Sequence, residues 1–144
     1  ITSKGPKGSE IQIESAYQAD NAQELFSKLR TKINVLVNDE RFKHSDIAII
    51  TTKSLKKTAL HDFNLKTVSI SKFEDDYNQK LLKVDTVRRF KGAESNVVIV
   101  TELDGLNEYS QEDRDKLLYV AFSRAKHLLI ILPTTDISNL DIAL

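Results

Sequence analysis

The stretch Ile47-Ala48-Ile49-Ile50 is a continuous apolar run, too short for a buried helix but long enough for a strand. Strands that are buried on both faces have this composition, because no polar residue alternates with the apolar ones. Similar runs follow at Val97–Val100 and Leu128–Leu132. Weaker strands are expected at Ile11–Ile13, Thr67–Ile70 and Lys83–Val87. The sequence therefore predicts a sheet whose central strands are covered on both sides.

Helical patterns separate these strands. Ala22, with further apolar residues at helical spacing, predicts a helix that is capped by Asp20 or Asn21 and runs to about Val37. Two more helices are expected at Ser54–Phe63 and Gln111–Ala125. Strands that alternate with helices indicate a mainly parallel α/β sheet. Residues 1–9 contain Gly5, Pro6 and Gly8 and are expected to be a linker or flexible segment, with one domain over residues 10–144.

Composition limits the classes of function. The 144 residues are 40% hydrophobic and 29% charged, which is typical of a globular domain. There is no cysteine, so we expect no disulfide and no structural metal site. Basic and acidic residues number 21 each, so any contact with nucleic acid must be local. No apolar run is long enough for a membrane span or a signal peptide, which makes the cytoplasm the expected location.

The first segment with functional chemistry runs from Val84 to Glu94. It places Arg88, Lys91 and Gly92 on a loop between two expected strands. A glycine there allows close backbone approach to a ligand. A simple turn with solvated basic side chains is the alternative interpretation.

The second segment, Leu117–Lys126, reads as a helix that leads into the strand at Leu128. The residues expected on its buried face are Leu117, Val120, Ala121 and Ala125. Arg124 lies near that face and must reach an anion or water. The alternatives are an arginine whose aliphatic stem is buried while its charge reaches solvent, or a pairing with Glu94 or Asp85.

Together the two segments resemble the last two motifs of superfamily 1 (UvrD/Rep-like) DNA helicases, approximately T-x-H-x-x-K-G-x-E and Y-V-A-x-[ST]-R-A. They stand here as Thr86 to Glu94 and Tyr119 to Ala125, in the family's order and with a buried strand between them. The resemblance implies a RecA-like three-layer domain, the C-terminal motor lobe. The stretch between the Ile47 strand and Thr86 is too short for the large accessory domain that some relatives insert there.

The resemblance also implies roles for individual residues. Arg124 matches the arginine finger that stabilises charge on the γ-phosphate of ATP. Gly92 and Glu94 match residues at the phosphate and ribose edge of the nucleotide. Thr86, Arg88 and Lys91 become candidates for contact with single-stranded DNA, or RNA. Arg88 replaces the usual histidine, Ala93 a usual leucine and Ser95 a usual aromatic residue.

The sequence lacks the P-loop pattern G-x-x-x-x-G-K-[ST]. ATP and Mg²⁺ are therefore expected to be shared with an N-terminal P-loop lobe of the same protein, and the isolated chain is not expected to hydrolyse ATP. Glu102 and Asp104 are read as a solvated strand exit rather than as metal ligands, and Ser123 has no histidine partner for nucleophilic catalysis.

Two alternatives to a motor lobe remain. The first is a degenerate helicase-like lobe that binds nucleic acid or protein without ATPase function. The second, an unrelated nucleotide-binding α/β protein, would need a glycine-rich first turn, which the sequence does not contain.

Overall fold

The computed structural model describes residues 2–4, 10–13, 22–90 and 93–133. Within these residues it shows a seven-stranded sheet with the order β1-β2-β7-β6-β3-β5-β4. The strands are β1 (Thr2–Lys4), β2 (Glu10–Ile13), β3 (Ile47–Thr51), β4 (Ile70–Lys72), β5 (Leu82–Thr86), β6 (Ser95–Thr101) and β7 (Ala125–Leu132). Only the pairing of β1 with β2 is antiparallel in the described sheet, and all other neighbours are parallel. The expected parallel α/β fold is confirmed.

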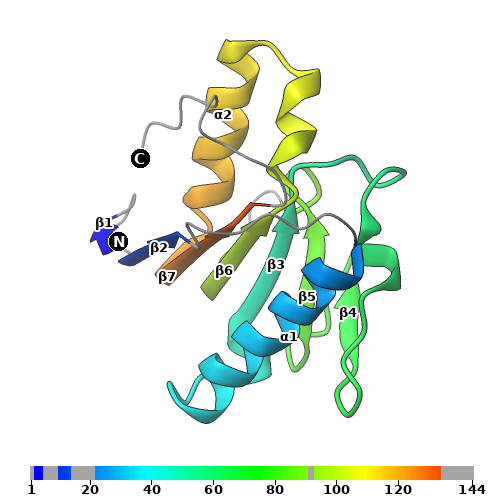
Figure 1. The fold of residues 1–144 in the computed structure, drawn as a ribbon, viewed down its shortest axis with the longest axis vertical. Coiled ribbons are helices and arrows are strands. Elements are labelled where there is room, and N and C mark those ends of the chain that lie inside the picture. The colour runs from blue at the N-terminus through cyan, green and yellow to red at the C-terminus, as the bar shows by residue number, and fades with distance from the viewer. Residues whose placement is uncertain (1, 5–9, 14–21, 91–92, 134–144) are drawn as a thin grey trace.

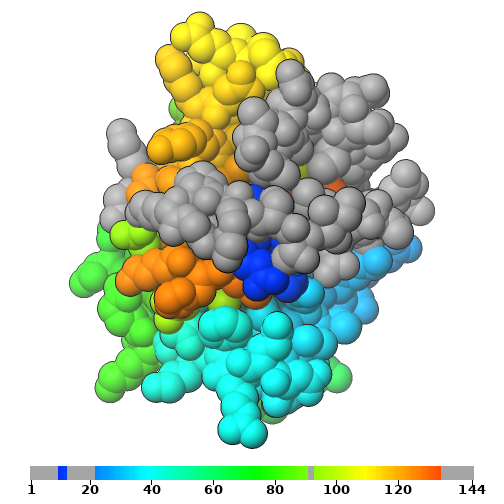
Figure 2. All heavy atoms as spheres, turned by 90° about the vertical axis from the view of Figure 1, so that its left-hand side faces the viewer, coloured from blue at the N-terminus to red at the C-terminus, as the bar shows by residue number. Residues whose placement is uncertain are grey.

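Helices cover both faces of the sheet (Figure 1). The helix α1 (Ala22–Asn38) packs on one face of the sheet, in a core that includes Ile47 and Ile49 of β3 and alternate residues of the neighbouring strands. The helix α2 (Gln111–Phe122) packs on the other face, against residues such as Ala48 and Ile50. Successive residues of a strand point to opposite faces, so a continuous apolar strand serves two cores at once. Figure 2 shows these layers from the side, with α2 above β7 and the end of α1 below it.

The prediction for α1 is confirmed. Its buried side consists of Leu25, Phe26, Leu29, Ile33 and Leu36. This spacing of three and four residues forms one apolar stripe along the helix. The expected caps, Asp20 and Asn21, lie outside the described residues.

The second helix, α2, is shorter than predicted. The hydroxyl of Ser110 accepts a hydrogen bond from the backbone N–H of Asp113 at 3.3 Å and caps its start. The helix ends at Phe122, so Arg124 lies in a turn and Ala125 begins β7. The predicted buried face was also wrong in part. Leu118, Ala121 and Phe122 are buried, whereas Leu117 and Val120 are only partly buried.

Two expectations between β3 and β5 are wrong. Residues 54–63 do not form an α-helix but turns that end in a 3₁₀-helix, η3 (Ala59–Asp62). Thr58 is buried there, and its hydroxyl caps η3 by accepting from Leu60 N. The strand expected at Thr67–Ile70 is displaced to β4, because Ile70 to Lys72 are the residues that pair with Leu82 to Val84.

The structure also contains short elements that the sequence did not predict. Two short 3₁₀-helices, η2 (His44–Asp46) and η4 (Leu103–Glu108), precede β3 and follow β6 respectively. The strand β1 occupies three residues of the segment expected to be a linker.

Candidate functional site

A pocket of about 260 Å³ lies at the carboxyl ends of β3 and β5. Thr52, Lys53 and Ser54, which directly follow β3, form one wall. Thr86 and Arg88 form another, and Tyr109 contributes an aromatic ring. The two strands are parallel and paired, so the residues that follow them meet at the same edge of the sheet. Ligands of open α/β sheets bind at this carboxyl edge.

The turn after β5 is fixed by Asp85 and Thr86. The carboxylate of Asp85 is fully buried and accepts a hydrogen bond from Thr86 N at 2.7 Å. The hydroxyl of Thr86 accepts from Arg89 N at 3.2 Å, and the carbonyl of Thr86 accepts from Phe90 N at 2.9 Å. Thr86 therefore lines the pocket from a tightly hydrogen-bonded turn.

The neighbouring arginines of this turn have different surroundings. Arg89 donates to the carboxylates of Asp85 at 3.0 Å and Asp75 at 3.1 Å and to the carbonyl of Phe73 at 2.9 Å. The hydrogen bond to Asp75 and the charge of Asp85 raise the pKa of Arg89. Arg88 is exposed like Arg89, but its guanidinium lies 5.1 Å from the ring centroid of Tyr109. Both arginines line the pocket, but Arg89 is held by carboxylates, whereas Arg88 lies beside an aromatic ring.

Tyr77 completes the group around Asp85. Its hydroxyl donates to the Asp85 carboxylate. Burial first, and then the hydrogen bond and the negative charge of Asp85, raise the pKa of Tyr77, so this phenol remains a donor at neutral pH. The buried carboxylate is therefore compensated on several sides.

Lys53 was not identified from the sequence, although its position directly after a buried strand is a signal for such an edge residue. Its ammonium group lies 3.0 Å from Asp104 and 3.9 Å from Glu102. These carboxylates offset its charge. Of the three cations that line the pocket, Lys53, Arg88 and Arg89, Arg88 alone has no carboxylate partner within the described part of the chain.

The expectation that Glu102 is a solvated residue is wrong. Glu102 is 2% exposed, not a solvated strand exit. Its carboxylate accepts from the hydroxyls of Thr51 at 2.6 Å and Thr58 at 2.5 Å and from the backbone N–H of Ala59 at 3.1 Å. It thereby connects the end of β6 to the end of β3 and to the loop that borders the pocket.

The backbone around Glu102 packs closely against the same loop. Glu102 has a left-handed φ of 55°, and its carbonyl accepts from the hydroxyl of Thr52 at 2.6 Å. A Cβ on Gly105 would lie 2.8 Å from both Lys53 N and the Thr52 hydroxyl. Only glycine fits at this position without moving the residues that follow β3.

Glu94 and Arg124 lie at the opposite, amino-terminal edge of the sheet. They directly precede Ser95 and Ala125, which are paired in register at the starts of β6 and β7. The N–H of Ser95 donates to the carbonyl of Arg124 at 3.0 Å. Because β6 has seven residues, this edge lies roughly 20 Å from the carboxyl edge. The structure thus brings Glu94 and Arg124 to neighbouring strand ends, away from Thr86 and Arg88.

The surroundings of Arg124 distinguish some of its possible roles. Asp85, one expected partner, instead accepts from Arg89 and Tyr77. The Nε of Arg124 and the hydroxyl of the adjacent Ser95 are both buried without a hydrogen-bond partner within the described residues. Ser123 donates its hydroxyl to Val120 O at 2.9 Å. A buried donor without a partner is costly, so the Arg124 side chain is suited to an acceptor from outside the described residues.

Two predicted site residues, Lys91 and Gly92, lie outside the described residues. Within the described ranges, no cluster of three or more histidines or carboxylates could hold a metal ion. The helices in the described part of the chain are too short or too polar to cross a membrane.

Known proteins resemble this chain in both sequence and fold. Residues 81–132 match the family model described as UvrD-like helicase C-terminal domain, and this segment contains both motifs. A solved structure described as the C-terminal domain of a possible DNA helicase from Lactobacillus plantarum WCFS1 has a TM-score of 0.57 at 21% sequence identity. The likeness covers 87% of this chain and 73% of that chain. No curated protein sequence matches the chain. The resemblance to the C-terminal lobe of UvrD-like helicases is thus confirmed over residues 81–132, and the expected fold with it.

Proposed function

We propose that this chain is the C-terminal motor lobe of an ATP-dependent superfamily 1 DNA helicase. In this proposal Arg124 is the arginine finger, and Gly92 and Glu94 contribute to the ATP site. Thr86, Arg88 and Lys91 bind single-stranded DNA. An N-terminal P-loop lobe of the same protein supplies the phosphate cradle and the Mg²⁺ ligands. ATP then binds between the two lobes, and their closure and reopening move the protein along the strand.

The observation that carries the proposal is where the two ends of the segment between β5 and β6 lie. This segment begins beside the pocket with Arg88 and ends beside Arg124 with Glu94. One short connection therefore joins the proposed binding site for single-stranded DNA, at the carboxyl edge of the sheet, to the proposed nucleotide site at the amino edge. A motor needs such a link, because movement at one site must follow events at the other.

The chemistry of each edge supports its proposed ligand. At the carboxyl edge, Arg88 and the hydroxyls of Ser54 and Thr86 are groups that bind phosphates without reading sequence. At the amino edge, Arg124 and Glu94 precede paired residues of neighbouring β-strands, and an arginine forms strong charge-assisted hydrogen bonds with phosphate oxygens such as those of ATP.

The test is ATP turnover by the intact protein in the presence and absence of a single-stranded oligonucleotide. A motor predicts hydrolysis that the strand stimulates. The competing proposal, a degenerate lobe that serves as a binding module, predicts strand binding without turnover. Binding without turnover would contradict the motor function but would still be consistent with the proposed binding site for single-stranded DNA.

The isolated 144-residue chain should show negligible ATPase activity and at most weak affinity for nucleotide. One arginine and one carboxylate cannot replace a P-loop and its bound magnesium ion. Calorimetric titration with ATP and Mg²⁺, together with a phosphate-release assay, measures both properties. Tight binding or turnover by the purified chain would show that the phosphate cradle is not confined to a partner lobe.

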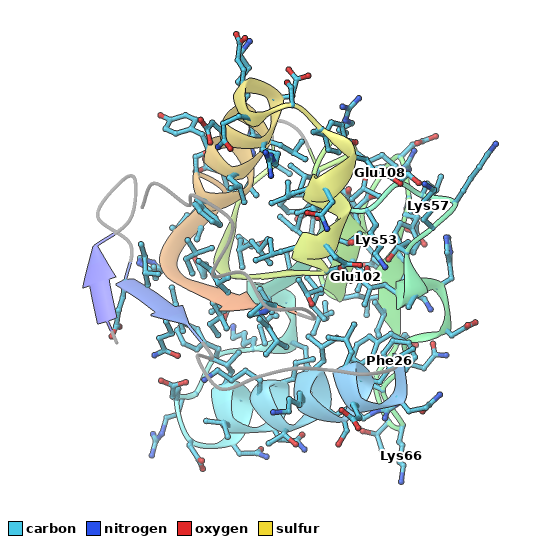
Figure 3. All side chains as sticks on the ribbon, turned by 45° about the horizontal axis from the view of Figure 1, so that its top comes forward. Phe26, Lys53, Lys57, Lys66, Glu102 and Glu108 are labelled. Atoms are coloured by element: carbon cyan, nitrogen blue, oxygen red, sulfur yellow. The ribbon has the colours of Figure 1, made fainter. Side chains whose placement is uncertain are left out.

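Arg88→Ala in the intact protein should weaken binding to every single-stranded sequence alike. A lost phosphate contact releases one counterion fewer, so the plot of log affinity against log salt should become shallower by about one unit. The matched control is Lys66→Ala, because Lys66 is exposed and lies on the α1 side of the molecule, away from Lys53 and Glu102 (Figure 3). If both variants kept the wild-type slope, Arg88 would not contact the strand.

A further inference from the structure

Tyr109 belongs to neither helicase-like motif, yet its ring borders the pocket at the carboxyl edge. We propose that Tyr109 is a positioning residue of the binding site for single-stranded DNA. Its ring holds the Arg88 guanidinium in place for a phosphate of the DNA. This inference rests on the proposed function, because it assigns Arg88 to the same strand.

The backbone of Tyr109 is fixed by its neighbours. It directly follows η4, and its N–H donates to Leu106 O at 3.1 Å. The next residue, Ser110, caps α2. Leu103 and Leu106 anchor η4 in the core on the α2 face of the sheet, while Gly105 packs against the residues that follow β3. The ring is therefore carried on a corner with little freedom, attached to the same loop that forms the pocket wall.

Arg88, in contrast, has no carboxylate partner among the described residues, and its guanidinium lies 5.1 Å from the Tyr109 ring centroid. The electron-rich face of an aromatic ring attracts a cation at this distance. A carboxylate would also hold the arginine, but it would offset the charge that a phosphate requires, as Asp104 does for Lys53. An aromatic ring orders the guanidinium and leaves its net charge available.

The physical cost of losing this contact is modest but measurable. An exposed arginine loses side-chain conformational entropy when it binds a phosphate, and a ring that already orders it reduces this loss. Tyr109→Leu should therefore weaken single-strand binding by the intact protein roughly two- to fivefold. Tyr109→Phe should bind within twofold of wild type, because the ring rather than the hydroxyl makes the contact.

A double-mutant cycle tests the positioning role. Binding of a dye-labelled oligothymidylate is measured for wild type, Tyr109→Leu, Arg88→Ala and the double variant. If Tyr109 acts through Arg88, Tyr109→Leu should have almost no further effect once Arg88 is alanine. An undiminished effect of Tyr109→Leu in the Arg88→Ala background would overturn the proposal.

A second oligonucleotide distinguishes a positioning role of Tyr109 from direct stacking of its ring on a base. An abasic oligonucleotide keeps the phosphates but offers no base to stack. Positioning predicts that Tyr109→Leu weakens binding to the abasic strand by the same factor as binding to oligothymidylate. A loss confined to the strand that carries bases would assign Tyr109 to stacking instead.

Two controls separate the possible failures. Pentafluorophenylalanine at position 109 keeps an aromatic shape but reverses the ring's attraction for a cation, so it should reproduce the loss even if Tyr109→Leu does not fold. Normal binding by that variant would overturn the proposal. If Arg88→Ala binds single-stranded DNA normally with an unchanged salt slope, the proposed DNA site itself is contradicted. If Arg88→Ala weakens binding but shows no coupling to Tyr109, only the positioning role of Tyr109 is contradicted.

Discussion

Arg124→Ala in the intact protein should lower ATP turnover on the order of 10³-fold or more, the range known for arginine fingers. The guanidinium would neutralise charge that develops on the γ-phosphate, so its loss affects the transition state more than the binding of ATP. Single-strand binding should change little, because Arg124 lies at the amino-terminal edge of the sheet, roughly 20 Å from the pocket. Steady-state turnover and strand affinity, measured on the same preparation, check both statements.

Arg124→Lys serves as the matched variant. A lysine keeps the charge but not the planar fork, so turnover should fall nearly as far as with alanine. A purely structural role makes a different prediction, since the Nε of Arg124 is buried at the start of β7. Both variants would then lower the melting temperature while turnover per folded molecule survived. Near-normal turnover in folded Arg124→Ala would remove Arg124 from the catalytic site.

The central strands and α1 could be predicted from the sequence because burial alone determines them. An apolar run such as Ile47 to Ile50 has to be covered on both faces, and the stripe of α1 supplies one cover. The failures arise where tertiary contacts outweigh local preference. Residues 54–63 have helical spacing, but Thr58 and Ala59 are bound by the Glu102 carboxylate, and turns followed by a 3₁₀-helix bring them within its reach.

The candidate site was predictable only as far as its motifs extend. Thr86, Arg88, Glu94 and Arg124 follow from strings whose order is visible in the sequence. The division of roles between Arg88 and Arg89 is not, because it depends on a carboxylate of β5 and on Asp75, which lie together only in the fold. Tyr109 reaches the pocket through η4, an element that the sequence pattern did not indicate.

Glu102→Ala should lower the free energy of unfolding by on the order of 3 kcal/mol. The substitution leaves the hydroxyls of Thr51 and Thr58 and the N–H of Ala59 without their buried acceptor, and each such group costs about 1–3 kcal/mol when it finds no other partner. For a domain whose total stability is about 5–15 kcal/mol, this is a large fraction. Urea denaturation of the purified chain, followed by circular dichroism, measures the change.

Glu108→Gln is the matched control, because Glu108 also pairs with a lysine but at the surface. Its partner, Lys57, is 61% exposed and Glu108 itself 53% (Figure 3). An exposed pair contributes about 0–1 kcal/mol, so this variant should unfold almost like wild type. Glu102→Gln should fall between the two, since an amide keeps one acceptor oxygen but places a donor where the carboxylate accepted. If Glu102→Ala were as stable as Glu108→Gln, Glu102 would not hold the loop. Lys53 and the hydroxyls of the pocket would then need another support.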